Sequence, residues 1–343
     1  MSSIARFRML ALASAVVMTG SVCSAESGTD TESARVPLLS DSEAWKRLPA
    51  VESGGGQPLP GWARALAGSL PRTTAAMLDL DRVQRTRSEL GPLLRGKMRW
   101  IAAQANQCRY AMAYAEADLR RAGLDEAGFR SLKGDHALLP EPERAALAFA
   151  RQMTVDASEV DDDDVARLIG WYGEHKLVAM VLLLAYANYQ DRLLLALGVT
   201  IEPNGPLPPL DVHFNPKADP PVVPPRRRPP GRPVPSEPER IDDPFWLSME
   251  YGDLQRQLSV QRSRSGRIRV PTWDEVLRVL PASVPRPEKP VRIRWSLVTM
   301  GYQPELAAAW SASTRAFGSE AKQDRVFEES LFWIVTRSIH CFY

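Results

Sequence analysis

Residues 68–110 read GSLPRTTAAMLDLDRVQRTRSELGPLLRGKMRWIAAQANQCRY. Residues 301–343 repeat this stretch at an offset of 233 residues, over 43 positions and without a gap. The identical positions are Gly68, Pro71, Ala75, Ala76, Arg82, Trp100, Ile101, Cys108 and Tyr110, which recur as Gly301, Pro304, Ala308, Ala309, Arg315, Trp333, Ile334, Cys341 and Tyr343. A fixed offset of this kind is typical of an internal duplication. The sequence therefore predicts one complete helical unit, followed by a second unit that stops within a cysteine motif.

The sequence around the first copy has apolar residues at helical spacing almost throughout. Pro71 suits the first turn of a helix, and residues 73–90 carry apolar side chains on one face. Further helices are predicted at 93–105 and 107–122. The run 177–187 is wholly apolar, but polar residues follow it at once, so it is predicted as the central helix of a bundle rather than a membrane span. Strand-like alternation is absent, and the predicted fold class is all-α.

Composition narrows the function classes. The chain has 343 residues, of which 44% are hydrophobic and 24% charged, as in soluble globular proteins. A net charge of +2, with scattered basic residues, gives no argument for nucleic-acid binding. Arg226, Arg227 and Arg228 are interpreted as solubilising charge. The four histidines lack metal-ligand spacing and no glycine-rich phosphate loop is present, so no metal and no cofactor are expected.

The N-terminus resembles a targeting segment. Arg6 and Arg8 precede a mostly apolar run, and Cys23-Ser24-Ala25 offers a small-residue cleavage site. We expect residues 1–25 to be a signal peptide and the mature protein to be exported to the periplasm or the extracellular space. A lipoprotein anchored through Cys23 is the alternative, but Gly20-Ser21-Val22 is a poor match to the residues that precede a lipidated cysteine.

Composition shifts divide the rest of the chain. Residues 203–238 hold 14 of the 29 prolines, which predicts an extended linker between the two copies. The expected segments are a flexible lead-in (26–65), the first helical domain (66–200), the Pro-rich linker (201–240), a second lead-in (241–290) and the incomplete second copy (291–343). The helices of the second copy are expected at 304–317 and 325–339.

Several motifs resemble one known family. They are Arg99-Trp100-Ile101-Ala102, Asn106-Gln107-Cys108-Arg109-Tyr110, Ala117-Asp118-Leu119, the run 143–151 and the run 187–193. Together they resemble the alkylhydroperoxidase-D-like group of the carboxymuconolactone decarboxylase superfamily. The resemblance implies a helical bundle, a homo-oligomer and a thiol-dependent peroxidase that acts on a peroxide or another small molecule with a thiol reductant. Active members carry a glutamate, a Cys-x-x-Cys and a histidine one turn later.

The first copy departs from that pattern at three of its four positions. Cys108 matches the first cysteine, whereas Ala111, Ala115 and Gly96 stand where the second cysteine, the histidine and the glutamate would be. A dithiol mechanism needs one thiolate to attack and a second thiol to resolve the product. Cys108 is therefore retained only as a degenerate site residue, and the first copy is expected to be inert as a dithiol peroxidase.

The second copy matches the pattern better but is incomplete. Glu329 and Cys341 match the family's glutamate and first cysteine, so they are the main candidate catalytic residues. The second cysteine and the histidine would fall after Tyr343, and the chain is expected to be a fragment of a longer protein. His340 adjoins Cys341 but does not face it on a helix, so a Cys-His pair is not expected.

Three functions stay open at this point. The first is an exported thiol peroxidase of the peroxiredoxin type, impaired or absent in these 343 residues. The second is a non-catalytic helical module for packing or oligomerisation. The third is a decarboxylase or lactone-processing enzyme, which the retained cysteines disfavour because that branch of the superfamily does not use them.

Overall fold

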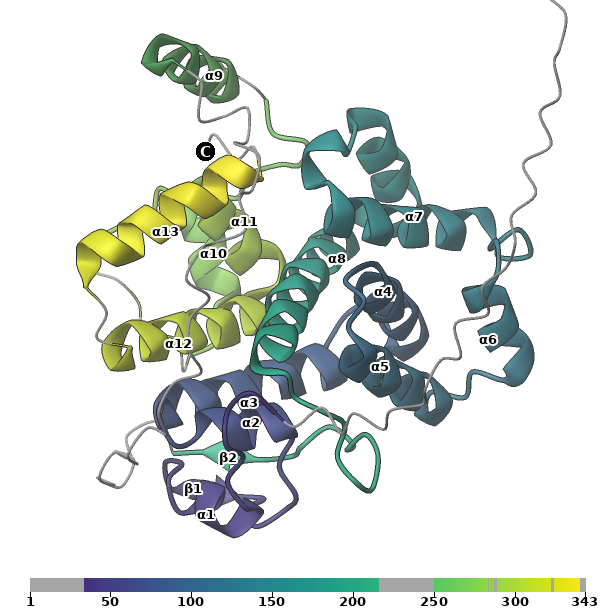
Figure 1. The fold of residues 1–343 in the computed structure, drawn as a ribbon. Helices are drawn as coiled ribbons and strands as arrows, with labels where there is room; N and C mark the ends of the chain where they lie inside the picture. The colour runs from purple at the N-terminus through teal and green to yellow at the C-terminus, as the bar shows by residue number, and fades with distance from the viewer. Residues whose placement is uncertain are drawn as a thin grey trace, which may run out of the picture. The chain divides into compact units, whose positions relative to one another are not determined.

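The computed structural model describes residues 34–215, 250–263, 265–282, 284, 286, 289–321 and 324–339. Helices dominate these residues, which confirms the all-α prediction (Figure 1). The helices are α1 (Asp41–Trp45), α2 (Gly61–Leu66), α3 (Pro71–Thr86), α4 (Pro92–Ala105), α5 (Arg109–Arg121), α6 (Glu126–Lys133), α7 (Glu141–Val155), α8 (Asp162–Leu197), α9 (Tyr251–Ser263), α10 (Trp273–Val279), α11 (Arg294–Tyr302), α12 (Pro304–Glu320) and α13 (Arg325–Ser338). The predicted signal peptide, His340 and Cys341 lie outside the described residues.

Helix α8 is the centre of the fold. It packs against α4 and α7 on one side and against α11 on another (Figure 1). Asp161 caps its start by accepting a hydrogen bond from the amide of Asp164 at 2.6 Å, and Gly173, at a φ of 78°, interrupts the helical geometry. By length and composition α8 could cross a membrane. Here most of its predicted apolar run, 177–187, is buried, as expected for a central bundle helix.

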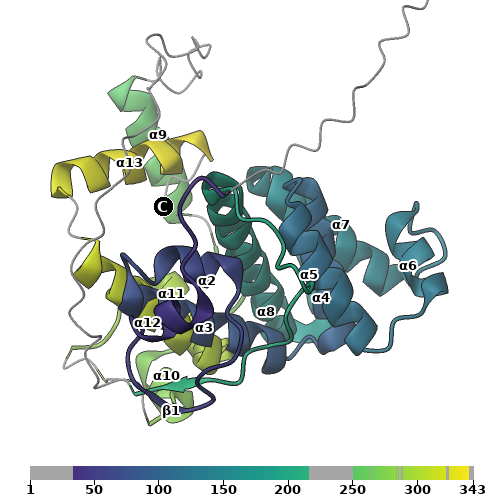
Figure 2. The same ribbon diagram turned by 60° about the horizontal axis from the view of Figure 1, so that its bottom comes forward.

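Helices α3 and α12 pack against each other (Figure 2). Both begin with proline, and the residues before them, Leu70 and Gln303, have nearly the same backbone angles: φ of −135° in both, and ψ of 60° and 63°. Glu320, at the end of α12, accepts hydrogen bonds from the amides of Arg72 and Thr73 at 2.7 and 2.8 Å. A carboxylate at these amides satisfies donors that a helix start leaves free, so the end of α12 caps the start of α3.

The segments predicted as a lead-in and a linker contain buried residues where the structure describes them. Leu59 and Trp62 are buried in the lead-in, and Leu210 and Val212 are buried in the linker. The strands β1 (Val51–Ser53) and β2 (His213–Phe214) join these two segments in an antiparallel pair. The predicted bounds of the lead-in (26–65) and of the linker (201–240) stay predictions. Proline removes backbone donors, but it does not stop the apolar residues between prolines from being buried.

The second predicted lead-in also contains an ordered element. Helix α10 begins with a reciprocal capping box between Thr272 and Glu275, and its Val276 is buried with Leu280 and Leu297. Tyr302, at the end of α11, donates a hydrogen bond to Glu174 of α8 at 2.6 Å. The beginning of the second copy is therefore joined to α8 by polar contacts as well as apolar ones.

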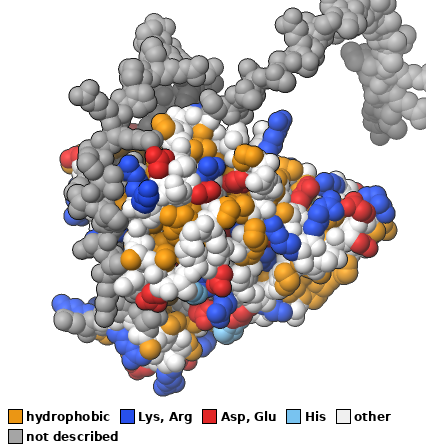
Figure 3. Space-filling model, turned by 90° about the horizontal axis from the view of Figure 1, so that it is seen from below, with side chains coloured by type: hydrophobic (Ala, Val, Ile, Leu, Met, Phe, Trp, Pro, Cys, Tyr) orange, Lys and Arg blue, Asp and Glu red, His pale blue; other side chains and the backbone are white. Residues whose placement is uncertain are grey.

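Acidic and basic side chains are interspersed on the face drawn in Figure 3, with apolar side chains between them. An electrostatic footprint for nucleic acid is a field of one sign. The coloured atoms of this face carry charges of both signs side by side, in keeping with the net charge of +2.

Candidate functional site

Cys108 is the N-cap residue of α5. Its side chain is only 1% exposed and packs in a cluster that includes Trp62 and Leu78. It is a free thiol, and it is the only free cysteine among the residues that the structure describes. A helix start by itself favours a thiolate, because backbone amides point towards it.

Burial outweighs the helix start. Desolvation and the negative charge of Asp191 raise the pKa of the Cys108 thiol to about 11, against the opposing effects of the Ala111 amide and the Arg99 guanidinium. Four pH units below that value, at pH 7, roughly one thiol in ten thousand is ionised. Since the thiolate is the nucleophile, the geometry makes Cys108 a poor attacking group.

The two alanines at the positions where the resemblance would place a second cysteine and a histidine both line one small cavity. Ala111 and Ala115 lie on its wall, and the space open to water within it is about 40 Å³. The glutamate position, Gly96, has no room for a side chain, because a Cβ there would lie 2.7 Å from Cδ2 of Leu119. Residues around this cavity are therefore arranged for something other than Glu-Cys-His chemistry.

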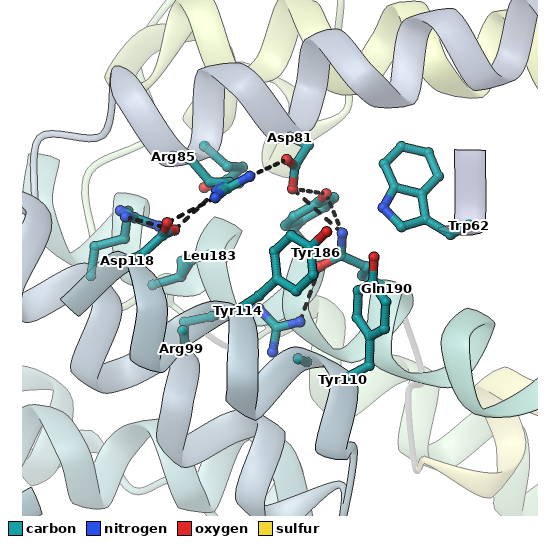
Figure 4. Close-up of a pocket in the computed structure, with 14 residues that line it drawn as sticks. Trp62, Asp81, Arg85, Arg99, Tyr110, Tyr114, Asp118, Leu183, Tyr186 and Gln190 are labelled. Carbon is teal, nitrogen blue, oxygen red and sulfur yellow. Dashed lines mark hydrogen bonds and ion pairs between the residues drawn. The ribbon is translucent and has the colours of Figure 1, made fainter. Parts of the chain in front are cut away.

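Five helices build the cavity wall (Figure 4). They contribute buried charged and aromatic side chains that converge on a space smaller than most ligand sites. The lining residues are Trp62 from α2; Asp81, Gln84 and Arg85 from α3; Arg95 and Arg99 from α4; Tyr110, Ala111, Tyr114, Ala115 and Asp118 from α5; and Leu183, Tyr186 and Gln190 from α8. The fold thus brings together residues from four stretches of the sequence.

Asp118 is shared by several arginines. Arg85 binds it with two donors, at 2.9 and 2.8 Å, and Arg121 contributes a third at 2.8 Å. Arg95 is the most distant partner, at 3.4 Å. Burial acts to raise the pKa of the Asp118 carboxyl, but the hydrogen bonds and charge of Arg85, helped by the other two, hold that pKa below its usual value.

Arg99 is paired behind the cavity. Its guanidinium binds both carboxylate oxygens of the buried Asp191 and donates to Oε1 of Gln190 at 3.0 Å. Asn106 donates to the same carboxylate at 3.0 Å. Burial acts to lower the pKa of Arg99, but the charge and hydrogen bonds of Asp191 outweigh it and the pKa is raised. This guanidinium is therefore already neutralised.

Asp81 belongs to the same polar network and contacts Tyr186 and Arg85. It accepts a hydrogen bond from the hydroxyl of Tyr186 at 2.8 Å, and Arg85 lies 3.3 Å from its other oxygen (Figure 4). Burial and the negative charge of Asp81 raise the pKa of Tyr186 well above its usual value, so its hydroxyl stays protonated and donates.

A segment from the predicted linker is tied to the cavity wall. Glu202 accepts hydrogen bonds from Tyr110 at 2.7 Å, from Tyr114 at 2.8 Å and from the amide of Gly61 at 2.6 Å. The carbonyl of Leu207 accepts a hydrogen bond from Arg85 at 2.9 Å. The proline-rich segment after α8 is thus part of the site rather than a free spacer.

Of the candidate residues of the predicted second copy, the structure describes Glu329, which is not among the residues of this network. Glu329 is exposed on α13, where its nearest ion-pair partner is Arg325 at 3.7 Å. Cys341 lies outside the described residues, so a pairing of Glu329 with Cys341 stays a prediction. At the offset of 233 residues, Glu328 and Phe332 stand where the first copy has Arg95 and Arg99. The arginine network therefore belongs to the first copy alone.

A larger hollow, of about 970 Å³, lies against α8 and is lined by α10, α11 and α12. Its described lining is mostly apolar, with Trp273 and Trp310 among the largest side chains. Arginines are the only ionisable groups in that described lining, which contains no carboxylate, histidine or cysteine. The described wall thus has hydroxyls, at Ser296, Thr299 and Ser311, but no carboxylate or histidine that could serve them as a base.

Several residues of the network were part of the sequence motifs, but no role was predicted for them. Arg99, Asp118 and Asp191 were part of the motifs that resemble a family, but Arg85, Arg95 and Gln84 were not noticed. One signal was available: Arg95 and Arg99 are four residues apart on a helix whose other residues include Met98, Trp100 and Ile101. Charges on the buried face of a helix indicate buried partners.

No model of a known protein family matches this chain, and no curated protein matches it.

Proposed function

We propose that this chain is a divergent member of the alkylhydroperoxidase-D-like group whose first helical unit no longer carries out dithiol chemistry. One observation carries the proposal: Cys108 is buried with a pKa raised to about 11, beside alanines at the positions of the second thiol and the histidine. In this proposal the first unit is a non-catalytic helical module, and its polar cavity replaces the peroxide site of the family.

We further propose that the chain arose by duplication of one helical unit. Support comes from the bounds of the helices, because α3 and α12 begin at Pro71 and Pro304, and α4 and α13 span Pro92–Ala105 and Arg325–Ser338. Each of these starts is 233 residues from its counterpart, which is the offset of the repeated residues. The packing of α12 on α3 then joins equivalent helices of the two units, as an isologous interface between two subunits would do.

Thiol peroxidase chemistry is proposed for the second unit only, at Glu329 and Cys341, in an exported protein. The exposure of Glu329 favours this assignment, since the equivalent position of the first unit, Gly96, has no room for a side chain. A glutamate open to solvent can reach a peroxide and relay a proton, as a general acid or base must.

Peroxide consumption tests both parts of the proposal. The whole chain, Cys108→Ser and Cys341→Ser are compared with hydrogen peroxide as the substrate and dithiothreitol as the reductant. We expect Cys108→Ser to match the parent chain, and any turnover above the buffer rate to disappear with Cys341→Ser. A loss of turnover in Cys108→Ser with correct folding would contradict the inert first unit.

A further inference from the structure

We propose that the cavity between α3, α4, α5 and α8 binds a small planar carboxylate that carries an O–H group, of the size of bicarbonate. Its carboxylate contacts Arg95, and its O–H donates to Oε1 of Gln84. This inference goes beyond the proposed function and does not depend on it, because it uses neither cysteine.

Arg95 is the guanidinium that lacks a counterion of its own. It is 5% exposed, and its one ion pair among the described residues is the 3.4 Å contact with Asp118. That carboxylate is already bound by two donors of Arg85 and one of Arg121. A buried cation is costly unless it is paired and hydrogen-bonded, so we expect an anion beside Arg95 in the cavity.

The ion pairs of the lining residues also single out Arg95. Arg85, Arg95 and Arg99 face the cavity, whereas the lining carboxylates are Asp81 and Asp118. Arg99 is neutralised from behind by Asp191, and Arg85 contacts both lining carboxylates. The other two guanidinium groups thus have closer carboxylate partners than Arg95, whose one contact with a lining carboxylate is 3.4 Å long. Burial and the repulsion of Arg85 outweigh the attraction of Asp118 and lower the pKa of Arg95, which fits an under-neutralised guanidinium.

Gln84 supplies the second, independent observation. Its side chain is 2% exposed, and its buried Oε1 accepts no hydrogen bond from any residue that the structure describes. The amide nitrogen of the same side chain lies 3.4 Å from the carbonyl of Leu182. Exchanging the two amide atoms would set oxygen against oxygen, so the unpaired atom is an acceptor, on a side chain that lines the cavity. Leaving a buried acceptor unpaired is costly, so the ligand should carry a hydrogen-bond donor.

The size of the cavity limits the ligand. A space of about 40 Å³ holds about three water molecules, or a ligand of about four non-hydrogen atoms. Because both groups line this one space, a single small molecule can contact both. Bicarbonate has four non-hydrogen atoms, one negative charge and one O–H group. Acetate has the same shape and charge, but a methyl group replaces the O–H, which makes the two anions a matched pair of probes.

Isothermal titration of the whole chain with sodium bicarbonate and with sodium acetate, at pH 8 and constant ionic strength, tests the proposal. We expect bicarbonate to bind about tenfold more tightly than acetate, because only bicarbonate can donate to Gln84. Gln84→Leu should reduce the ratio of the bicarbonate and acetate affinities to near one. Equal binding of the two anions by the parent chain would overturn the role of Gln84.

Two further variants test the anion site itself. Arg95→Met should reduce binding of both anions by at least about tenfold. Gln84→Glu keeps the shape of the side chain and places a negative charge beside Arg95, so it should abolish anion binding in a folded protein. Arg109→Met removes an exposed guanidinium that does not line the cavity and should bind as the parent does.

The outcomes are decisive even where one variant does not fold. If Arg95→Met is unfolded by circular dichroism, Gln84→Glu carries the test alone. A parent chain that binds neither anion would mean that water alone fills the cavity, and it would overturn the proposal. Unchanged bicarbonate binding in folded Gln84→Glu would overturn it equally.

Discussion

Helices α4 and α13 are fourteen residues long each and begin 233 residues apart, at the offset of the repeated residues, yet their surroundings differ completely. Trp100 of α4 is 2% exposed, whereas its counterpart Trp333 of α13 is 50% exposed. Helix α4 packs against α5, α7 and α8. The same apolar pattern is therefore a core element in one unit and an exposed surface in the other, because burial depends on the helices that surround it.

The polar residues of the two helices sharpen the comparison. Arg95, Lys97 and Arg99 of α4 are buried with carboxylate partners, while the equivalent positions of α13 are Glu328, Ser330 and Phe332. Buried charge needs a partner built by the rest of the fold. Helix α4 has those partners, and at the offset of 233 residues α13 has none of these three basic side chains.

The largest contrast is expected for the paired tryptophans. Trp100→Ala should lower the free energy of unfolding by about 4 kcal/mol, because it opens a cavity in the core. Trp333→Ala should change it by less than about 1 kcal/mol, because the side chain it truncates is half exposed in the parent protein. Urea denaturation followed by circular dichroism measures both. Similar losses in the two variants would mean that α13 is buried as α4 is, and the comparison would fail.

A smaller effect is expected at the carboxylate that three arginines share. Asp118→Asn should cost about 3 kcal/mol at pH 7, since it leaves buried guanidinium groups without their anion. The pKa of Asp118 is lowered in the folded state, so its contribution is complete above its ordinary pKa of about 3.9 and is lost as the pH falls through the folded value.

The pH dependence is the control for this prediction. The difference in unfolding free energy between the parent chain and Asp118→Asn should narrow as the pH is lowered below about 4. A difference that stays constant down to the acid transition would show that the carboxylate charge is not what the arginines need.

The smallest effect is expected on α13. Glu329→Gln removes an exposed pair with Arg325, four residues away on the same helix, and should change the free energy of unfolding by less than about 0.5 kcal/mol. Thermal unfolding of the variant beside Asp118→Asn measures the contrast. A destabilisation as large as that of Asp118→Asn would indicate that Glu329 is buried by a partner of α13.

The helices were the predictable part of the fold. Proline at the first turn and apolar spacing indicated α3 and α12, and the apolar run 177–187 indicated the buried part of α8. The packing of residues 34–65 and 203–215 was not predictable in the same way. Trp62 and Val212 are buried by contacts with elements far away in the sequence, and local composition does not carry that information.

The site was less predictable than the fold. Ala111 and Ala115 stand where the resemblance would place a second cysteine and a histidine, but the sequence could not tell that both alanines line a cavity. The partners of Asp118 come from α3, α4 and α5. Glu202, from the proline-rich segment, accepts a hydrogen bond from Tyr110 of the cavity wall. Such long-range pairings follow from the topology of the bundle and not from residue spacing.

The most direct test of an inert first unit is the ionisation of Cys108 itself. In a Cys23→Ser, Cys341→Ser background, the carbon-13 chemical shift of the Cys108 Cβ atom is followed against pH by NMR in the folded protein and in urea. We expect a pKa of about 11 in the folded protein, and a return to the ordinary value near 8.5 in urea. A folded-state pKa below 7 would contradict the account, because Cys108 would then be an activated thiolate at the start of α5.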